Sequence, residues 1–405
     1  MKQDKPSLEP GARPAEGFIP LCVPEIRGNE WAYVKECLDT GWVSSVGAYV
    51  TRLENDIAAR LGGGQAVAFT SGTAALHVAL ILAGVGPGDE VLLPALTFIA
   101  PAFAVRYTGA WPVICDVDPD YWQMDPAQVG RFLRDDCRHE GGALINRATG
   151  RRVKALLPVD LLGHPADMDA LMELAAEFGL TVIEDATESL GALYKGRPVG
   201  RLGHIGCLSF NGNKTITTGG GGMLVTGDPA LADKARYLST QAKDDAIEYV
   251  HNQVGFNYRL SNVQAAMGCA QLELLDEYVA AKRRIHQAYQ QGLAGVPGVT
   301  VMALAPWAHS ACWMSTIVVD PAAHGRDCRA LLKALHARRI QTRPLWQPLH
   351  QSPALAGGHG LGCPVSERLH ARGLSLPSSV GLSPADQQRV IEAIGHIAGQ
   401  APERG

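Results

Sequence analysis

Between residues 66 and 226 the chain alternates short apolar runs with stretches of helical periodicity. The runs that predict strands are AVAFT, EVLLP, WPVIC, KALLPV, TVIEDA, CLSF and MLVT. Helical patterns follow several of them, for example at 72–84 and 167–178. Because β and α segments that alternate at this spacing build a sheet covered by helices, the predicted fold class is α/β with a mainly parallel central sheet. CLSF and MLVT have no helix between them, so we expect a local antiparallel hairpin there.

A long helical pattern at 260–293 separates this region from a second unit. Gly295 and Pro297 follow the pattern and are typical stop signals. Beyond them, WMSTIVVD and QTRPL predict strands, and helices are expected near 325–339 and 386–399. The second unit is therefore expected to be a smaller α+β domain.

The chain is predicted to divide into three parts: a flexible N-terminal lead-in at 1–20, a large domain at 21–290 and a small C-terminal domain at 291–405. The lead-in is polar and rich in proline, which is not the pattern of a signal peptide. We expect the segment 20–40 to pack against the small domain.

The composition argues against several classes of function. A net charge of -4 provides no basic field for nucleic acid and no polybasic segment for a membrane surface. The nine cysteines are scattered singly, without a C-x-x-C pair, which favours reduced thiols in the cytoplasm over disulfides or a structural metal site. The longest apolar run, AALHVALILAGVG, is too short to span a bilayer.

The stretch AFTSGTAALHVAL is the first of three that point to chemistry. A strand runs into Ser71, Gly72 and Thr73, and an apolar helix follows. A helix start presents free N–H groups and a positive dipole end, which together bind a phosphate. Plain capping of the helix by Ser71 or Thr73 is the alternative explanation.

The second stretch is TVIEDATESLG, in which two carboxylates follow a predicted buried strand. Asp185 stands at the carboxyl end of that strand, where open α/β sheets bind their ligands. Such a carboxylate can coordinate a metal, orient a ribose or pair with a protonated pyridine nitrogen. The alternatives are a solvated strand end or a helix cap, and a structural role is favoured for Glu184.

The third stretch, SFNGNKTITTGGGG, sets Lys214 among small polar residues and glycines. Ser209 and Asn211 offer hydrogen-bonding groups, and a desolvated lysine amine is suited to Schiff-base chemistry. The loop is not a phosphate-binding Walker A loop, because Leu208 and Asn213 occupy the positions of its two glycines. An ordinary exposed loop lysine is the alternative.

Taken together, the three stretches match the requirements of pyridoxal 5'-phosphate (PLP): an anion cradle, a partner for the pyridine nitrogen and an amine for the aldehyde. An aromatic ring over the cofactor would complete the set, and Phe98 in PALTFIAPAF is placed to supply it. A phenylalanine of the core is the alternative for Phe98.

Several motifs resemble the DegT/StrS family of nucleotide-sugar aminotransferases, in the family's order and over most of the chain. They are GNEWAYVKECLDTGWVSSVGAYVTRLE, TSGTAALHVAL, PALTFIA, IEDATESLGA, SFNGNKTITTGGGGM, GFNYRLSNVQAAMG and RPLWQPLHQSP. The resemblance implies the type I PLP-dependent transferase fold, with 21–290 as the PLP-binding domain. It also implies a homodimer whose active sites lie at the subunit interface.

The resemblance assigns roles to the residues of these motifs. Lys214 would bond to the cofactor's aldehyde and later move protons, and Asp185 would pair with the pyridine nitrogen. The residues expected to hold the phosphate, stack on the ring or approach its hydroxyl are Gly72, Thr73, Ser209, Phe98 and Glu188. The FNYR motif is similar to a segment lent to the partner's site, with Asn257 reaching the phosphate and Arg259 nearby.

The resemblance also implies a reaction. A lysine at position 214, where a dehydratase branch of the family has histidine, argues for transamination. The expected reaction moves an amino group from L-glutamate to the C4 ketone of a UDP- or GDP-linked 4-keto-6-deoxy-N-acetylhexosamine, as in bacillosamine or legionaminic-acid pathways. Residues that could face the sugar or nucleotide, or be structural, are Ser44, Ser45, Trp346 and His350.

Two alternatives remain open at this point. One is another PLP aminotransferase, acting on a C3 ketosugar or a small molecule. The other is a non-catalytic sensor with the PLP fold, which predicts a degraded cofactor site. The intact set of Lys214, Asp185 and Ser209 argues against the sensor.

Overall fold

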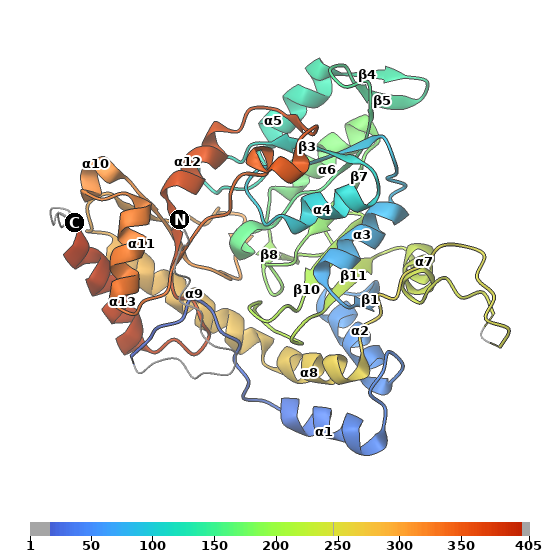
Figure 1. Cartoon of the computed structure of the whole chain (residues 1–405), viewed down its shortest axis with the longest axis horizontal. Helices are drawn as coiled ribbons and strands as arrows, with labels where there is room; N and C mark the ends of the chain where they lie inside the picture. Colours follow the sequence, from blue (N-terminus) through green and yellow to red (C-terminus); the bar gives the residue numbers. More distant parts are fainter. Residues whose placement is uncertain (1–16, 246, 399–405) are drawn as a thin grey trace.

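The computed structural model describes residues 17–245 and 247–398 (Figure 1). A large sheet runs through the centre of the molecule. Its main strands, in spatial order, are β1 (Gln65–Phe69), β11 (Gly222–Thr226), β10 (Ile205–Ser209), β7 (Thr181–Asp185), β6 (Arg152–Leu156), β2 (Asp89–Pro94), β3 (Trp111–Cys115) and β16 (His359–Gly360). The hairpin of β4 (Cys137–Glu140) and β5 (Ala143–Asn146) extends it beside β6.

The pairing within this sheet confirms the predicted mainly parallel arrangement. The neighbours from β10 through β7, β6, β2 and β3 to β16 are all parallel. The neighbours β10 and β11 form the predicted antiparallel hairpin, and β11 also pairs with β1 in antiparallel register. The carboxyl ends of β7 and β10 therefore lie at the same edge of the sheet, which brings Asp185 near Ser209.

Helices cover both faces of the sheet, so its strands are buried on both sides. Consecutive residues of β2 belong to two separate apolar clusters: Leu92 packs into one, and Val91 and Leu93 pack into the other. A strand buried in this way reads as a continuous apolar run. The helices that flank the sheet are α2 (Ala48–Arg60), α3 (Gly72–Leu82), α4 (Ala100–Tyr107), α5 (Pro126–Arg131), α6 (Met168–Phe178) and α7 (Pro229–Ser239).

The long helix expected at 260–293 is two helices, α8 (Asn262–Glu273) and α9 (Leu275–Leu293). They break at Leu274, whose backbone angles are φ -107° and ψ 4°. The break lets α8 pack against α1 (Glu30–Thr40) and α2, while α9 packs against α13 (Pro384–Ile397). Periodicity cannot reveal this break because no glycine or proline marks it.

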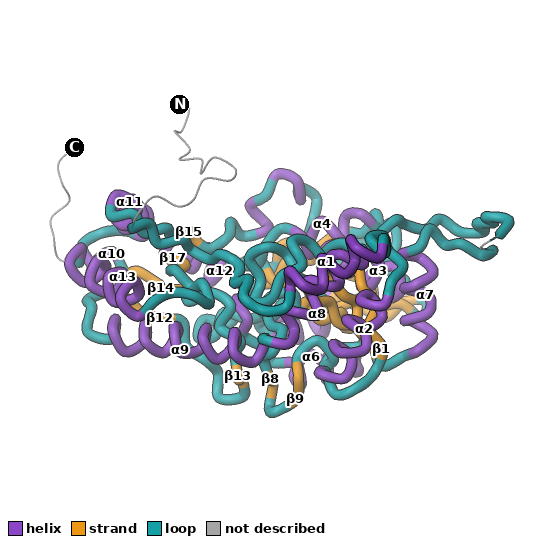
Figure 2. The backbone as a smooth tube through the Cα atoms, turned by 90° about the horizontal axis from the view of Figure 1, so that it is seen from below, coloured by secondary structure: helices purple, strands orange, loops and turns teal. Residues whose placement is uncertain are grey.

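A second sheet of four strands lies beside α9 (Figure 2). Its order is β12 (Val299–Val301), β14 (Thr316–Val319), β17 (Gly373–Ser375) and β15 (Arg343–Pro344). The helices of this region are α10 (Pro321–His324), α11 (Cys328–Ala337), α12 (Pro364–Arg372) and α13. The predicted boundary at residue 290 falls inside α9, so the domain division stays a prediction.

The segment 20–40 does not pack against the small sheet as one piece. Near its start, Leu21 donates its N–H to Gln341 Oε1 and accepts a hydrogen bond from the Ser378 N–H. The helix α1 that follows packs instead against α8. Only the first part of the expectation is therefore correct, and residues 1–16 of the predicted lead-in lie outside the described residues.

Figure 2, turned by 90°, shows the two groups of elements side by side along the long axis. A small sheet of β13 (Ala308–His309), β8 (Leu193–Tyr194) and β9 (Arg197–Pro198) lies along one edge of this view. The loop after α7 extends away from the body in both views. Within the described residues, no helix is both long and apolar enough to cross a membrane.

Candidate active site

A cavity of about 340 Å³ opens where the carboxyl ends of β7 and β10 meet the start of α3. It gathers residues that lie far apart in the chain, from Ser71 to Trp346. The predicted residues that line it are Gly72, Thr73, Phe98, Asp185, Glu188, Ser209, Lys214 and Trp346. The structure therefore brings most of the residues expected to hold a cofactor into one place.

The start of α3 forms one wall of the cavity and serves two purposes. Ser71 caps the helix, because its Oγ accepts a hydrogen bond from the Ala74 N–H at 3.1 Å. The same turn lines the cavity through Ser71, Gly72 and Thr73. The capping explanation is thus correct for Ser71, and it leaves the positive end of the helix facing the cavity.

Gly72 lets the start of α3 approach the end of β10 and the turn after β7 closely. A Cβ atom at this position would lie 3.0 Å from Ser209 Cβ and 3.2 Å from Thr187 Cγ2. Any larger residue would therefore push Ser209 or Thr187 away and reshape the end of the cavity where an anion would lie.

Asp185 ends β7 with its side chain buried at the cavity wall. Its Oδ1 accepts a hydrogen bond from the Thr187 N–H at 3.1 Å. Burial raises the pKa of this carboxyl above its usual value, and the Thr187 hydrogen bonds and the Lys214 charge oppose that rise. A cation bound in the cavity next to Asp185 would offset the cost of burying its negative charge.

Lys214 is not an exposed loop lysine, because only 14% of its side chain is accessible. Its Nζ donates to Glu188 Oε1 at 3.5 Å and lies 4.3 Å from the centre of the Trp313 indole ring. Burial raises the pKa of the Glu188 carboxyl, although the Lys214 charge counteracts this. The amine thus stands between a carboxylate and an aromatic face inside the cavity.

Phe98 lies at the cavity with 52% of its surface exposed, so it is not a residue of the core. Trp313 and Trp346 also line the cavity, with nearly parallel rings whose centres lie 6.4 Å apart. Trp313 was missed in the sequence because WMSTIVVD reads as one strand from residue 313. The strand β14 begins at Thr316, which leaves Trp313 in the preceding loop.

Glu184 has the structural role that the sequence favoured. Its Oε1 accepts a hydrogen bond from the Gly200 N–H, and its Oε2 accepts from the Leu202 and Gly203 N–H groups. Adjacent residues of β7 point to opposite faces, so Glu184 fixes a turn on one side while Asp185 faces the cavity on the other.

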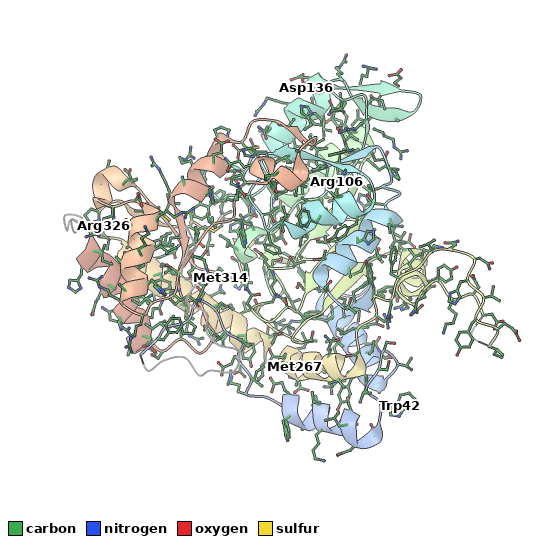
Figure 3. All side chains as sticks on the ribbon, viewed as in Figure 1. Trp42, Arg106, Asp136, Met267, Met314 and Arg326 are labelled. Carbon is green, nitrogen blue, oxygen red and sulfur yellow. The ribbon has the colours of Figure 1, made fainter. Side chains whose placement is uncertain are left out.

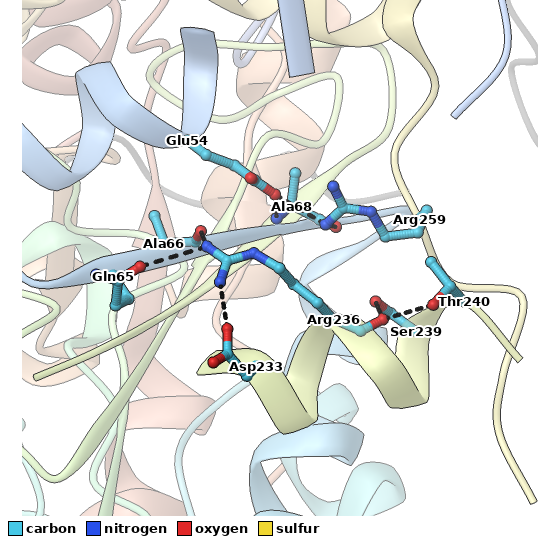
Figure 4. Close-up of polar contacts among 9 residues, drawn as sticks. All are labelled: Glu54, Gln65, Ala66, Ala68, Asp233, Arg236, Ser239, Thr240 and Arg259. Carbon is cyan, nitrogen blue, oxygen red and sulfur yellow. Dashed lines mark hydrogen bonds and ion pairs between the residues drawn. The ribbon is translucent and has the colours of Figure 1, made fainter. Parts of the chain in front are cut away.

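Arg259 and Asn257 lie outside this cavity. Figure 4 shows the Arg259 guanidinium against Glu54 and the Ala68 carbonyl, at 2.8 and 3.2 Å. The same close-up shows Arg236 of α7 donating to the Ala66 carbonyl on the same strand, β1. Arg259 thus holds its own segment against β1. Asn257 forms an isolated β-bridge with Thr240 at the base of the loop after α7, and the role of FNYR in another subunit stays a prediction.

Ser44, Ser45 and His350, also expected near a substrate, lie outside the cavity lining. The Ser44 carbonyl accepts a hydrogen bond from the Asn262 N–H at 2.6 Å, and Ser45 follows it in an exposed loop. His350 Nε2 pairs with Glu367 Oε1 at 2.8 Å. Of the substrate residues predicted, only Trp346 lines the cavity.

A wider groove of about 1020 Å³ lies elsewhere, along α9 and β8. It is lined by Arg60, Arg283, Arg284 and His286, and it shares no residue with the cavity of Lys214. Size alone therefore does not select the functional site. The smaller cavity holds the Lys214 amine together with the buried carboxylates of Asp185 and Glu188.

The residues of the cavity fit PLP. The start of α3 and Ser209 form an anion cradle that a Cβ at Gly72 would fill, and Asp185 is a buried carboxylate that a protonated ring nitrogen would neutralise. Lys214 presents a primary amine to the same space, and Phe98 offers an aromatic face at its mouth. The donor set thus matches the phosphate, the ring and the aldehyde of the cofactor.

Comparisons with known proteins agree with this fit. The sequence profile of the DegT/DnrJ/EryC1/StrS aminotransferase family matches residues 24–395. GDP-perosamine synthase of Caulobacter vibrioides is 42% identical over 381 residues, covering 94% of this chain and 98% of that protein. GDP-perosamine synthase of Escherichia coli O157:H7 is 37% identical over 377 residues, covering 93% and 98%.

The fold is similar to that of solved structures as well. DesI, whose crystal structure was determined in the presence of its TDP-sugar product, superimposes with a TM-score of 0.84 at 30% sequence identity. The match covers 96% of this chain and 94% of DesI. The predicted type I PLP-dependent transferase fold is thereby confirmed.

Proposed function

This chain belongs to the DegT/DnrJ/EryC1/StrS family of PLP-dependent aminotransferases, and we propose that it aminates a nucleotide-linked ketosugar. The donor is L-glutamate, and the acceptor is the C4 ketone of a 4-keto-6-deoxyhexose. The observation that carries this proposal is the cavity in which Lys214, Asp185 and the start of α3 meet. The GDP-perosamine synthases among the relatives support a sugar as the acceptor.

Each wall of the cavity has a role in holding the cofactor. The N–H groups at the start of α3, with Gly72, Thr73 and Ser209, bind the phosphate. Asp185 pairs with the pyridine nitrogen and keeps that nitrogen protonated. Because the Asp185 carboxylate is buried, a positively charged partner offsets the cost of burying its negative charge. Phe98 stacks on the ring and Glu188 hydrogen-bonds near it.

When bound, PLP carries the amino group and withdraws electrons from the bond that breaks at the substrate carbon. The protein supplies the proton transfers. Lys214 Nζ takes the proton from the donor's α-carbon and, in the second half of the reaction, returns a proton to C4 of the sugar. Glu188 Oε1, at 3.5 Å, and the Trp313 ring keep this amine within the cavity between the two transfers.

The finer choice of substrate is an N-acetylated hexosamine linked to UDP or GDP. The similarity of WVSSVG and RPLWQPLHQ to enzymes that aminate such sugars supports the acetamido group. The names of the relatives support a nucleoside diphosphate carrier, with GDP in the synthases and TDP in DesI.

The active enzyme is a homodimer in the cytoplasm, with sites shared between subunits. The loop after α7 extends away from the body and carries exposed apolar residues, Ile247, Tyr249 and Val254. Packing these side chains against a second copy of the chain would bury their apolar surface away from water. In the dimer, Asn257 of the partner subunit reaches the phosphate.

The proposal is tested by following the transfer of isotopically labelled nitrogen from glutamate to a sugar. The purified protein with PLP is incubated with [15N]glutamate and, in parallel, UDP- and GDP-linked 4-keto-6-deoxy sugars with and without the 2-acetamido group. We expect 15N at C4 of one of these sugars, by mass spectrometry and NMR. A 3-keto nucleotide sugar and the Lys214→Ala variant are the controls. Label only in the 3-keto sugar, or in no sugar at all, would contradict the proposal.

A further inference from the structure

Two distant parts of the chain meet at the backbone carbonyl of Asn213, the residue before Lys214. Trp313 donates its indole Nε1–H to this oxygen at 2.7 Å, and the Cys22 thiol lies 3.4 Å from it. Trp313 is itself held by the buried Lys282 of α9, whose Nζ donates to the Trp313 carbonyl at 3.0 Å. The reactive lysine is therefore anchored by residues from the N-terminal segment and from the region of the small sheet.

The Trp313 side chain also contacts the reactive group. Lys214 Nζ lies 4.3 Å from the centre of the indole ring, within the range of a cation–π interaction. Glu188 Oε1 lies 3.5 Å from the same nitrogen, and its other oxygen accepts the Leu162 N–H at 2.8 Å. One oxygen of Glu188 is thus fixed by the backbone, which leaves the other to face the ammonium.

A single turn positions both of these partners. Leu162 has a positive φ of 60°, uncommon outside glycine, and this conformation presents its N–H to Glu188. The next residue, Gly163, accepts hydrogen bonds from Ser310 Oγ at 2.7 Å and from the Ala311 N–H at 2.9 Å, just before Trp313. The carboxylate and the indole are therefore placed by the same piece of backbone.

Gly163 allows this arrangement because it has no side chain. Its φ is +85°, and a Cβ atom there would lie 2.8 Å from the Trp313 backbone nitrogen. Met314, the residue after Trp313, is labelled in Figure 3 between the helices of the small sheet and the central region. The loop that carries Trp313 thus reaches across from the second sheet to the cavity.

We infer that Trp313 is a positioning residue for Lys214. Its N–H fixes the backbone before the lysine, and its ring face holds the Lys214 ammonium whenever the amine is not bonded to the cofactor. The inference deepens the proposed function and rests on it. A lysine side chain has four rotatable bonds, so a released amine without such a support would leave the geometry that proton transfer needs.

The test uses the cofactor-free protein and measures how fast Lys214 is acylated by trace acetic anhydride at neutral pH. Peptide mass spectrometry compares Lys214 with the half-exposed Lys35 of the same molecule as internal standard. A lysine side chain held between an aromatic face and a carboxylate presents its amine to the reagent less often, so it reacts more slowly. For Trp313→Leu and Trp313→Met we expect the Lys214-to-Lys35 ratio to rise roughly two- to fivefold, as the loss of one cation–π contact implies.

Two further variants separate the ring face from general repacking. Trp313→Phe keeps an aromatic face but loses the N–H bond to the Asn213 carbonyl, so its labelling ratio should rise less than in the two non-aromatic variants. Trp307→Leu removes a tryptophan that packs edge-on against Tyr121 and lies outside the cavity, so its ratio should not change. Thermal unfolding of every variant identifies any that fail to fold, and two non-aromatic replacements guard against such a failure.

An unchanged ratio in both non-aromatic variants would overturn the inference, as would an equal rise in Trp313→Phe. The labelling needs neither glutamate nor a sugar. If the ratio rises as expected but no sugar is aminated, the proposed function fails while the contact between Trp313 and Lys214 stands. If the native protein aminates a sugar and the ratios do not change, the inference alone fails.

Discussion

At the scale of single residues, neighbouring carboxylates in β7 have different tasks. Glu184 and Asp185 are both buried, and burial raises the pKa of both carboxyl groups. Glu184 offsets its burial with three backbone N–H groups of the turn at 200–203. Asp185 faces the cavity, where a bound cation can offset it. Both carboxylates are buried, so burial does not distinguish their roles. Their partners do: Glu184 is satisfied by backbone N–H groups and is structural, whereas Asp185 is free to pair with a ligand in the cavity.

This difference predicts opposite effects for two isosteric substitutions. Asp185→Asn should lower kcat on the order of 100-fold or more, because a neutral amide no longer favours a protonated pyridine nitrogen. It should change the melting temperature little. Glu184→Gln should lower the melting temperature while the folded fraction keeps its kcat. Steady-state kinetics and thermal unfolding of both variants measure this, and equal kcat values would refute the distinction.

Gly72 allows a second test at this scale. In Gly72→Ala the added methyl group meets Ser209 and Thr187 and narrows the anion cradle. We expect at least about tenfold weaker binding of PLP, which corresponds to about 1.4 kcal/mol, measured by titrating the cofactor-free protein. Gly86→Ala is the matched control because a Cβ there would meet nothing within 4 Å. If both variants bound PLP equally well, the methyl group at position 72 would not narrow the anion cradle, and the prediction would be wrong.

At the scale of elements, the start of α8 supports the glycine loop of the site. Ser261 and Gln264 form a capping box, and Gln264 Nε2 donates to the Gly220 carbonyl at 2.5 Å. Gly220 in turn lines the cavity. One helix start thus ties the loop after Lys214 to the layer formed by α8.

Ser261→Ala removes the side-chain acceptor of this cap. We expect a loss of about 1 kcal/mol in the free energy of unfolding, because the first N–H groups of α8 lose a partner. Chemical denaturation of the variant and of Ser352→Ala, a serine that makes no side-chain cap in its short helix, checks this. A loss of the same size in both would argue against the cap.

The turn at 161–164 makes the fold sensitive to acid. His164 Nδ1–H donates to the Pro165 carbonyl, and Nε2 accepts the Ala305 N–H at 2.9 Å, so the ring is held neutral. Burial lowers the pKa of His164 to about 4 from an ordinary 6.5. At pH values between about 4 and 6.5, His164 therefore binds a proton in the unfolded chain but not in the folded chain. The free energy of unfolding consequently falls as the pH drops from about 6.5 toward 4.

The size of this effect is roughly 3 kcal/mol at pH 4, since one pKa unit corresponds to about 1.4 kcal/mol. The free energy of unfolding should decline across this window in the native protein and decline less steeply in His164→Gln. Denaturant titrations at several pH values measure both slopes. Identical slopes would mean that His164 does not titrate as its surroundings imply.

At the scale of the whole molecule, the sequence predicts the parts that local patterns control. The central strands are continuous apolar runs; Asp185 ends one of them, and Gly72 and Lys214 each follow one in the chain. The two-residue strands β8, β9 and β16 were not predicted, because only pairing across the fold makes them strands. The break at Leu274 was missed for a similar reason, since tertiary packing bends a helix that has no local stop signal.

The candidate site shows the same limit. Trp313 lies 99 residues beyond Lys214 in sequence, and no pattern links the two. Their contact depends on α9, on the turn at 161–163 and on the small sheet, which together bring the loop before β14 to the cavity. Site residues that follow the ends of strands can be identified from the sequence. Residues that support them from a distant loop can be identified only from the three-dimensional structure.

The central claim is that Lys214 carries out PLP-dependent amino transfer in this cavity. Its most direct test is the visible absorption spectrum of the purified protein with PLP, before and after L-glutamate is added, alongside Lys214→Ala. In the native protein we predict a visible absorption band from the cofactor bonded to Lys214, and this band should disappear when glutamate is added. In Lys214→Ala we predict no band that glutamate removes. No such band after PLP is supplied, or the same bleaching with turnover in Lys214→Ala, would contradict the account.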